Sequence, residues 1–361
     1  MSREAEQTVD ELLLRTLRML SPGSVLHEAL ESILRARTGA LIVVGDSPEV
    51  LSLVNGGFHI DAEITAAALY ELAKMDGALI LSHDTKRILY ANTHLTPDPS
   101  IPTRETGTRH RTAERIARQT GELVISISQR RNVITLYRGA MRYVMRDVGV
   151  ILAKASQALA TLERYKSVFK EALHNLSALE FEDLVTLSDV LTCVQRAQMV
   201  QRIAAEIGRY VAELGSEGRL VVMQLEELLM DMHDEDLLVV KDYAVDGRDE
   251  NPDEVMAALR QWTSEELLDL ALIAKALGIQ KTAADLDTPM TPRGHRLLHK
   301  VPRLPEQVIA NLVEHFGSLP EIIAASTEEL DVVEGIGEVR ARAIREGLRR
   351  LREQVLLERP L

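Results

Sequence analysis

A cluster of cations flanked by hydroxyls begins the segment GTRHRTAERIARQT at residues 107–120. The pattern predicts a helix with Thr108 as its N-cap, which places the cations of Thr108–Thr112 in the first helical turn. Cations are unfavourable at that end of the helix dipole unless a bound anion shares the site. Guanidinium groups, hydroxyls and free backbone N–H groups together predict a phosphate receptor. Its candidate residues are Thr108, Arg109, His110, Arg111 and Thr112.

The same helix has one basic and one apolar side. At 100° per residue, Arg111, Arg115 and Arg118 share a face. An ordinary solvated basic face that pairs with Glu105 and Glu114 is the alternative interpretation. It accounts for Arg115 and Arg118, but not for the cationic pentapeptide placed directly after a loop rich in proline and threonine. The residues expected to pack on a sheet are Ala113, Ile116, Ala117 and Thr120.

A single carboxylate stands before a predicted buried strand. In MDGALIL, Asp76 lies between a helix expected at 64–75 and a strand expected at 78–82. Gly77 and Ala78 are small, so a ligand can approach the backbone closely. A carboxylate at that position can bind a divalent cation or accept a proton from a hydroxyl. The alternative is an ordinary Asp-Gly turn.

Other chemical signatures in the sequence are weak. There is no GxxxxGK[ST] loop, and GIGEVR at 335–340 follows TEELDVVE and ends in arginine, which excludes a Rossmann fingerprint. Cys193 is the only cysteine, so neither a disulfide framework nor a cysteine-based zinc site is expected. His295 and His299 have the spacing of a zinc pair, but without a nearby third ligand we expect a helix surface.

The DGA motif at 76–78 and GTRHRTAE at 107–114, with HLTPDPSIP upstream of the latter, closely resemble the diadenylate cyclase domain. With its helical middle and the C-terminal GIG element, the chain is similar over its whole length, and in the same order, to the DNA integrity scanning family of bacterial DNA-binding diadenylate cyclases. Neither motif departs from the family pattern. The helical middle is not diagnostic by itself.

The resemblance implies condensation of two ATP molecules into cyclic di-AMP with release of two pyrophosphates. Asp76 would support attack of a ribose 3′-hydroxyl on the partner's α-phosphate and would bind Mg²⁺ or Mn²⁺. Two sites must then face each other, so one protomer should be inactive, and the family is octameric. The catalytic residues implied are Asp76, Arg109, His110 and Arg111. The ATP-binding residues implied are Asp76, Gly77, Ala78, Leu95, Thr108, Arg109, His110, Arg111, Thr112 and Ser128.

The segment VEGIGEVRARAIREGLRRLR has the form of a helix-hairpin-helix, with Gly335-Ile336-Gly337 as the hairpin. Residues 335–352 hold six arginines against two glutamates, a local charge of +4. Such a surface would bind DNA through the phosphate backbone, independently of sequence and sensitively to salt. A protein-interaction module is the alternative. The candidate DNA-binding residues are Gly335, Ile336, Gly337, Arg340, Arg342 and Arg345.

Charge divides the chain into three parts. The net charge is −13, yet residues 1–144 hold 17 basic and 17 acidic residues, and residues 292–361 hold 11 of each. Residues 145–291 hold 14 basic and 27 acidic residues, which is the whole excess. The shift predicts a separate acidic middle segment and leaves a nucleic-acid partner open for the other parts. The predicted domains are 1–145, 146–291 and 292–361.

The elements that must position these residues follow from periodicity. Interleaved helices and strands in the first domain, with strands expected at 39–46, 78–82, 123–128 and 133–139, predict a mixed β-sheet flanked by helices. From Val150 to Ile279 apolar residues recur at helical spacing, interrupted at Gly215 and Gly218, which predicts a helical bundle. The fold class expected is therefore multidomain, α/β plus all-α, with a C-terminal helix-hairpin-helix domain.

Composition and the N-terminal sequence predict where in the cell the protein acts. Hydrophobic residues make up 46% of the chain and aromatic residues 3%, which indicates aliphatic cores. No apolar run approaches the roughly 18 residues that a membrane span needs. The N-terminus carries charges of both signs and no cleavage site, unlike a signal peptide. We expect a cytoplasmic, nucleoid-associated protein without a membrane partner.

The sequence is consistent with two functions from different classes. The first is a diadenylate cyclase regulated by branched or junction DNA, as a DNA-damage checkpoint sensor. The second is a non-catalytic oligomeric DNA-binding scaffold in which the cationic cluster only holds nucleotide. A structure-specific nuclease is disfavoured, because no carboxylate cluster has metal-ligand spacing.

Overall fold

The computed structural model describes residues 3–230, 232, 234–245, 248, 251–280 and 285–357, with side chains from residue 11 onward. The chain forms two compact units: Met1–Ser156 with Gly208–Val222, and Gln157–Ile207 with Met223–Leu361. The three domain ranges expected from the sequence stay a prediction. No helix within the described residues is long and apolar enough to cross a membrane.

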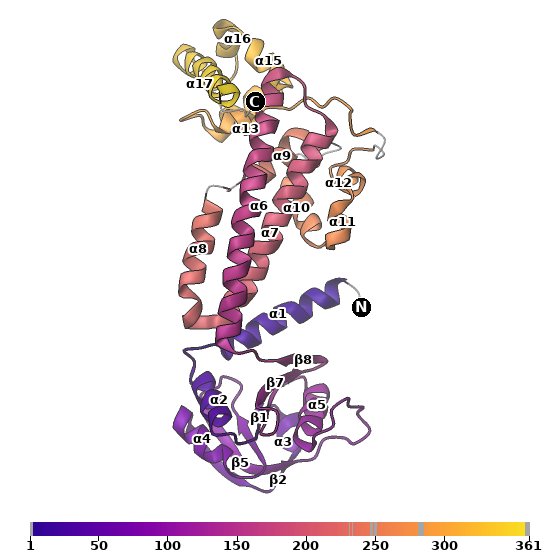
Figure 1. The fold of residues 1–361 in the computed structure, drawn as a ribbon, viewed down its shortest axis with the longest axis vertical. Helices are drawn as coiled ribbons and strands as arrows, with labels where there is room; N and C mark the ends of the chain where they lie inside the picture. The colour runs from indigo at the N-terminus through magenta and orange to yellow at the C-terminus, as the bar shows by residue number, and fades with distance from the viewer. Residues whose placement is uncertain are drawn as a thin grey trace. The chain divides into compact units, whose positions relative to one another are not determined.

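A mixed sheet is the scaffold of the first unit (Figure 1). Its strands are β1 (Ala40–Val44), β2 (Val54–Asn55), β3 (Phe58–Glu63), β4 (Ala78–Leu81), β5 (Arg87–Leu95), β6 (Leu123–Ser128), β7 (Val133–Arg138) and β8 (Met141–Val144). The strand order is β2-β5-β4-β1-β6-β7-β8, and β3 also pairs with β5. Strands β1 and β4 pair in parallel, and the other pairings among the described strands are antiparallel.

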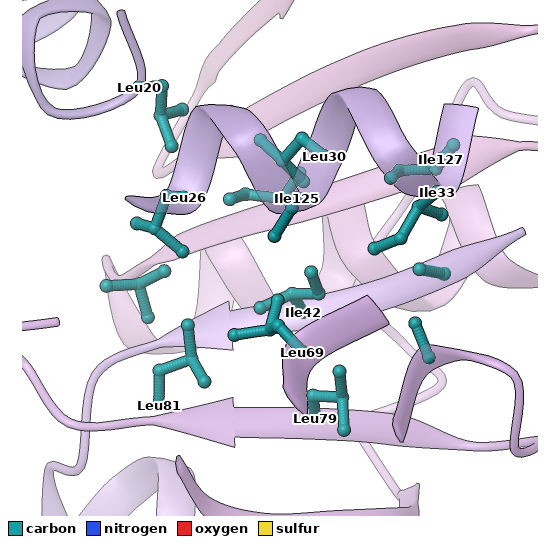
Figure 2. Packing of buried hydrophobic residues seen from close by; sticks show 14 of the residues in the cluster. Leu20, Leu26, Leu30, Ile33, Ile42, Leu69, Leu79, Leu81, Ile125 and Ile127 are labelled. Atoms are coloured by element: carbon teal, nitrogen blue, oxygen red, sulfur yellow. The ribbon is translucent and has the colours of Figure 1, made fainter. Parts of the chain in front are cut away.

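Helices cover both faces of this sheet. They are α1 (Arg3–Met19), α2 (Val25–Arg35), α3 (Pro48–Ser52), α4 (Ala66–Ala73) and α5 (Thr108–Thr120). Side chains alternate along β1, so Ile42 packs with α2 and α4 while Val43 packs with α3 and α5. Figure 2 shows Leu26, Leu30 and Ile33 of α2 lying over the strand residues of the first face. The predicted sheet flanked by helices is confirmed.

Some strands escaped prediction for a physical reason. Strand β3 is exposed along almost its whole length, so it lacks the buried alternation that marks a strand in sequence. Strands β2 and β8 are too short to show a period. The helix expected at 64–75 is shorter than predicted, because Thr65 caps it by accepting from the Ala68 N–H.

The middle of the chain is helical, as predicted. Its elements are α6 (Val148–Glu182), α7 (Leu187–Leu214), the 3₁₀ helix η1 (Gly215–Gly218), α8 (Arg219–Met230), α9 (Glu235–Tyr243), α10 (Pro252–Arg260), α11 (Ser264–Leu268) and α12 (Leu270–Ala276). The interruption expected at Gly215 and Gly218 is η1.

The C-terminal part consists of short helices followed by one long helix. These are α13 (His295–His299), α14 (Glu306–Phe316), α15 (Leu319–Ala324), α16 (Thr327–Asp331) and α17 (Glu338–Leu357). They share a core to which α6 contributes Phe181 and α17 contributes Ile344. Ile336 belongs to that core and is 7% exposed, so it anchors the turn between α16 and α17.

Candidate functional site

One edge of the sheet gathers the predicted site residues. Because β1 and β4 run parallel, they begin at the same edge, and the antiparallel neighbours β5 and β6 end there. Asp76 and Gly77 precede β4, Leu95 ends β5 and Ser128 ends β6. Helix α5 brings its first turn to this edge, as the contact between Arg109 and Asp76 demonstrates.

Asp76 and Arg109 form an ion pair across the two motifs. Arg109 Nη2 donates to Asp76 Oδ1 at 3.1 Å. The Asp76 side chain is 93% exposed, so most of its carboxylate is open to a ligand or cation. The Arg109 guanidinium also lies directly over Gly39, where a Cβ would overlap it. The structure therefore brings together the DGA motif at 76–78 and the Arg109-His110-Arg111 cluster.

Gly77 meets a requirement of the backbone. Its φ is +98°, a left-handed value that favours glycine. A Cβ at Gly77 would lie 2.8 Å from the carbonyl carbon of Asn92 and 2.9 Å from the carbonyl oxygen of Thr93. The main chain after Asp76 can thus pack directly against β5, and the next residue, Ala78, is buried opposite Thr93.

Helix α5 starts differently from the prediction. The N-cap is Gly107, not Thr108, because Arg111 N–H donates to the Gly107 carbonyl at 2.9 Å in the first helical hydrogen bond. Thr108 is the first helical residue, so its hydroxyl does not cap the helix. Glycine offers no side-chain acceptor, and the N–H groups of residues 108–110 have no acceptor within the described part of the chain. The first turn keeps its donors for an anion.

Arg118 is exposed and pairs with Glu114, as the basic-face interpretation expects, but Arg115 and Arg118 also bind carbonyls of the loop before α5. Arg115 Nε donates to the Ile101 carbonyl and Arg118 Nη1 to the Pro102 carbonyl, both at 3.0 Å. Arg118 also pairs with buried Glu114 at 2.7 Å. The glutamate accepts from the Thr103 hydroxyl at 2.5 Å and from the Arg104 N–H at 3.1 Å. These side chains fix the proline-rich loop onto α5, a tertiary role without a local sequence signal.

His110 lies at the start of a hydrogen-bonded chain. Its Nδ1 is 3.0 Å from the Tyr137 hydroxyl, which donates to Glu105 Oε1 at 2.9 Å. Arg142 Nε donates to the same carboxylate oxygen at 2.7 Å. Burial lowers the pKa of His110, although Glu105 opposes this. Glu105 therefore pairs with Arg142, not with the basic face of α5.

The other predicted ligand residues lie at or near the same edge. Leu95 is half-buried and pairs with Val54 of β2. Ser128 is half-buried, and its Oγ accepts from the Arg131 N–H at 3.2 Å. Arg111 is exposed and Thr112 half-buried in α5. Their contacts with a nucleotide stay predictions.

Within the described residues, no group of three or more histidine, cysteine or acidic side chains could hold a metal ion. Asp76 still fits a site of another kind. Mg²⁺ commonly binds through one or two carboxylates and completes its shell with substrate phosphates and water. An almost fully exposed carboxylate beside the predicted phosphate receptor meets that requirement.

The C-terminal hairpin presents backbone donors and cations together. Gly335 has φ +84°, and the N–H groups of residues 337–339 have no acceptor within the described part of the chain. A groove of about 430 Å³ lies beside α17, and its apolar lining residues include Phe181, Ile322 and Ile323. All six arginines of the segment are exposed, and four line this groove: Arg342, Arg345, Arg349 and Arg352.

A buried ionic network in the second unit was not predicted. Arg296 is 0% exposed and donates to Glu180 Oε2 at 2.5 Å, and Tyr243 donates to Glu180 Oε1 at 2.7 Å. Asp242 accepts the His295 N–H at 2.7 Å and thereby caps α13. The surface position expected for His295 is wrong, because that residue is 8% exposed. A lone arginine in a short helix gives no sequence signal of burial.

Two family models match the chain. Residues 27–141 match the model described as "DisA bacterial checkpoint controller nucleotide-binding", and residues 145–286 match "DisA bacterial checkpoint controller linker region". The first match contains Asp76, Thr108–Thr112 and the remaining residues of the sheet-edge site. The second covers most of the acidic helical segment.

Curated proteins are similar along nearly the whole chain, under the name "DNA integrity scanning protein DisA". The one from Symbiobacterium thermophilum is 61% identical over 347 residues, which are 96% of this chain and 98% of that protein. The one from Carboxydothermus hydrogenoformans is 57% identical over 345 residues, 96% and 98% of the two chains. The one from Acetivibrio thermocellus is 55% identical over 349 residues, 97% of each.

Proposed function

Because this chain belongs to the DisA family of DNA integrity scanning proteins, we propose that it is a diadenylate cyclase, which condenses two ATP molecules into cyclic di-AMP and two pyrophosphates. The ion pair between Arg109 and Asp76 carries the proposal. It joins the two motifs at one sheet edge, inside the segment that matches the family's nucleotide-binding model. A carboxylate and a phosphate receptor are the two parts that phosphoryl transfer between nucleotides needs.

In the proposed site the basic residues bind phosphate, and the acidic residue acts on the attacking hydroxyl. Arg109, His110 and Arg111 hold the phosphates together with the free N–H groups of the first turn of α5, and they neutralise charge that develops in the transition state. Asp76 supports the attacking ribose 3′-hydroxyl of one ATP on the α-phosphate of the other. Gly77 lets the nucleotide lie against the backbone. Contacts from Ala78, Leu95, Thr108, Thr112 and Ser128 complete the proposed nucleotide site.

Asp76 would hold Mg²⁺ or Mn²⁺ together with the ATP phosphates. The ion supplies charge neutralisation at the reacting phosphate. In the free protein, Arg109 donates a hydrogen bond to one oxygen of the Asp76 carboxylate. A bound cation and phosphate give Asp76 and Arg109 new partners of the correct charge.

Joining two ATP molecules symmetrically requires two sites that face each other, so the active species is a homo-oligomer, an octamer by family resemblance. In each of the two bonds, the 3′-hydroxyl of the ATP held by one protomer attacks the α-phosphate of the ATP held by its partner, and pyrophosphate leaves. Specific activity should therefore fall on dilution below the dissociation constant of the facing pair. Activity per protomer that is unchanged by dilution into the monomeric range excludes this arrangement.

The C-terminal segment is proposed as a helix-hairpin-helix domain that binds DNA through its phosphates. The turn at Gly335–Gly337 anchored by Ile336, the free N–H groups after it, and exposed arginines support this. Arg340, Arg342 and Arg345 add positive charge. The free backbone N–H groups address phosphates and not base edges, so binding should be independent of sequence.

Incubation of the full-length protein with ATP and Mg²⁺ or Mn²⁺, followed by chromatography, tests the cyclase. Cyclic di-AMP and pyrophosphate are the expected products. The alternative function, an oligomeric DNA-binding scaffold that holds nucleotide without turnover, predicts ATP binding and no cyclic product. Absence of product with both metals rejects the cyclase and leaves the scaffold.

The regulatory part of the proposal is that branched DNA lowers cyclase output, as in a DNA-damage checkpoint sensor of the nucleoid. Turnover at low salt should fall when a four-way junction is added and recover as salt releases the DNA. A linear duplex of the same sequence is the control for DNA structure. Unchanged turnover with the junction bound rejects the regulation and leaves the cyclase intact.

A further inference from the structure

The chain of hydrogen bonds behind His110 lies outside both sequence motifs. His110 of α5 bonds Tyr137 of β7, and Tyr137 bonds Glu105 in the loop before α5. Arg142 of β8 donates to the same glutamate. The Tyr137 side chain is 1% exposed and packs in the core beneath α5, so its hydroxyl has a fixed place. The position of the His110 ring is therefore fixed by Tyr137 and Glu105, which belong to neither the DGA motif nor the cationic cluster.

The direction of each hydrogen bond follows from the available protons. Burial acts to raise the pKa of Glu105, but the hydrogen bonds from Arg142 and Tyr137 outweigh it and leave the pKa below its ordinary value. Glu105 is therefore an ionised carboxylate, which has only acceptors. Tyr137 has one proton and gives it to Glu105. Its oxygen can then only accept, so the Nδ1 of His110 must be the nitrogen that carries a proton.

The other ring nitrogen is left without a partner. His110 Nε2 is buried and makes no hydrogen bond within the described part of the chain. An unsatisfied buried polar atom costs about 1–3 kcal/mol, so its presence beside a phosphate receptor indicates a ligand that completes it. The charged groups that act on the ring are Glu105 from the loop, Arg131 from the turn after β6, and Arg142 from β8.

We propose that Tyr137, held by Glu105, is a positioning residue that fixes His110 as the Nδ1–H tautomer and reserves Nε2 for the nucleotide. To donate to an ionised phosphate oxygen, Nε2 takes up a proton from solvent. Glu105 stabilises the resulting imidazolium through the Tyr137 hydroxyl. The nucleotide contact rests on the proposed cyclase function, whereas the tautomer is a property of the free protein.

Four substitutions in the full-length chain separate positioning from packing. Tyr137→Phe removes the acceptor for Nδ1 and keeps the buried ring. Glu105→Ala frees the Tyr137 proton to turn toward His110. Glu105→Gln replaces the carboxylate with an amide whose oxygen can still accept from Tyr137, so it should preserve the tautomer. The matched control is Tyr143→Phe, because the Tyr143 hydroxyl also donates to a carboxylate, that of Glu213, at 2.7 Å, away from His110.

The first readout is the imidazole ¹⁵N spectrum of histidine-labelled free protein, in which His110→Gln identifies one set of signals among ten histidines. The wild type and Glu105→Gln should show His110 protonated on Nδ1. Tyr137→Phe and Glu105→Ala should shift protonation toward Nε2. Wild-type His110 protonated on Nε2 overturns the assignment, as does a tautomer that Tyr137→Phe leaves unchanged.

The second readout is kcat for cyclic di-AMP synthesis. Tyr137→Phe should lose about tenfold or more, because misplacing a positioned group by about 1 Å can cost on the order of 10²-fold. Tyr143→Phe should stay within about twofold. A Tyr137→Phe kcat equal to that of the control overturns the positioning role. If the wild type makes no cyclic di-AMP, the cyclase proposal fails, and the ¹⁵N spectrum still decides the tautomer.

Discussion

Arg109 and Asp76 are separated by 33 positions in the chain, yet Arg109 Nη2 lies 3.1 Å from Asp76 Oδ1. The pair forms because β4 begins at the edge where α5 begins, and because Gly39 leaves space for the guanidinium. Each side chain alone has an ordinary explanation, an Asp-Gly turn or a basic helix face. Their contact joins a carboxylate and the proposed phosphate receptor in one site.

Gly77→Ala should destabilise the protein and its site. The left-handed φ of +98° and a Cβ only 2.8 Å from the Asn92 carbonyl carbon both oppose alanine. We expect the free energy of unfolding to fall by about 2–4 kcal/mol, measured by urea titration. The matched control, Gly121→Ala, has φ +73° and open space around the Cβ, so about 1 kcal/mol should be lost. Equal losses would show that backbone conformation alone matters.

The stability of the protein should depend on the protonation of His110. Burial lowers its pKa from the ordinary 6.5, so below that pH the unfolded chain binds a proton that the folded protein resists. The free energy of unfolding should therefore rise with pH through the window just below about pH 6.5. His110→Gln should flatten that rise, while the exposed His59→Gln keeps it. Identical slopes in the wild type and His110→Gln contradict the depressed pKa.

Truncating Arg296 should be severely destabilising. Arg296→Met leaves the buried carboxylate of Glu180 without its cation, a change that typically costs about 3–5 kcal/mol. Adding Glu180→Gln removes the stranded charge and should restore part of the loss. Arg350→Met, at an exposed pair with Glu346, should change the free energy of unfolding by less than about 0.5 kcal/mol. Urea unfolding of all variants measures these differences, and a mild Arg296→Met is the contrary result.

DNA affinity should depend on which arginine of α17 is lost. Arg345 lines the groove beside α17, whereas Arg350 does not line it and is held in an ion pair with Glu346. Arg345→Gln should weaken binding to all sequences alike and reduce the slope of log affinity against log salt by about 1. Arg350→Gln is the charge-matched control. Equal effects of the two variants in a fluorescence titration would point to diffuse charge instead of a DNA-binding face.

Periodicity and residue type predicted the central elements well. The strands at 40–44 and 78–81 are continuous apolar runs, and those at 123–128 and 133–138 are rich in β-branched residues. The apolar side of α5 is buried as its helical spacing requires. Family resemblance placed Asp76 and Arg109 in one site, which spacing alone does not predict.

What escaped prediction depends on contacts between distant segments. Arg115 and Arg118 carry no local mark of the loop carbonyls that they bind. Thr108 is a better N-cap type than Gly107, but the chain enters the helix one residue earlier. The hydrogen-bond partner of His110, Tyr137, is 27 positions away in the chain, and its sequence context is that of an ordinary buried strand.

The most direct test of the account is cyclic di-AMP production by Asp76→Asn, measured beside Asp84→Asn. Both substitutions remove an exposed carboxylate from the same sheet, but Asp84 lies in the turn between β4 and β5, at the opposite edge. We expect Asp76→Asn to lose at least about 10²-fold in turnover, because it removes the carboxylate that supports the attacking hydroxyl, and Asp84→Asn to stay near wild type. Undiminished product from Asp76→Asn would contradict the account.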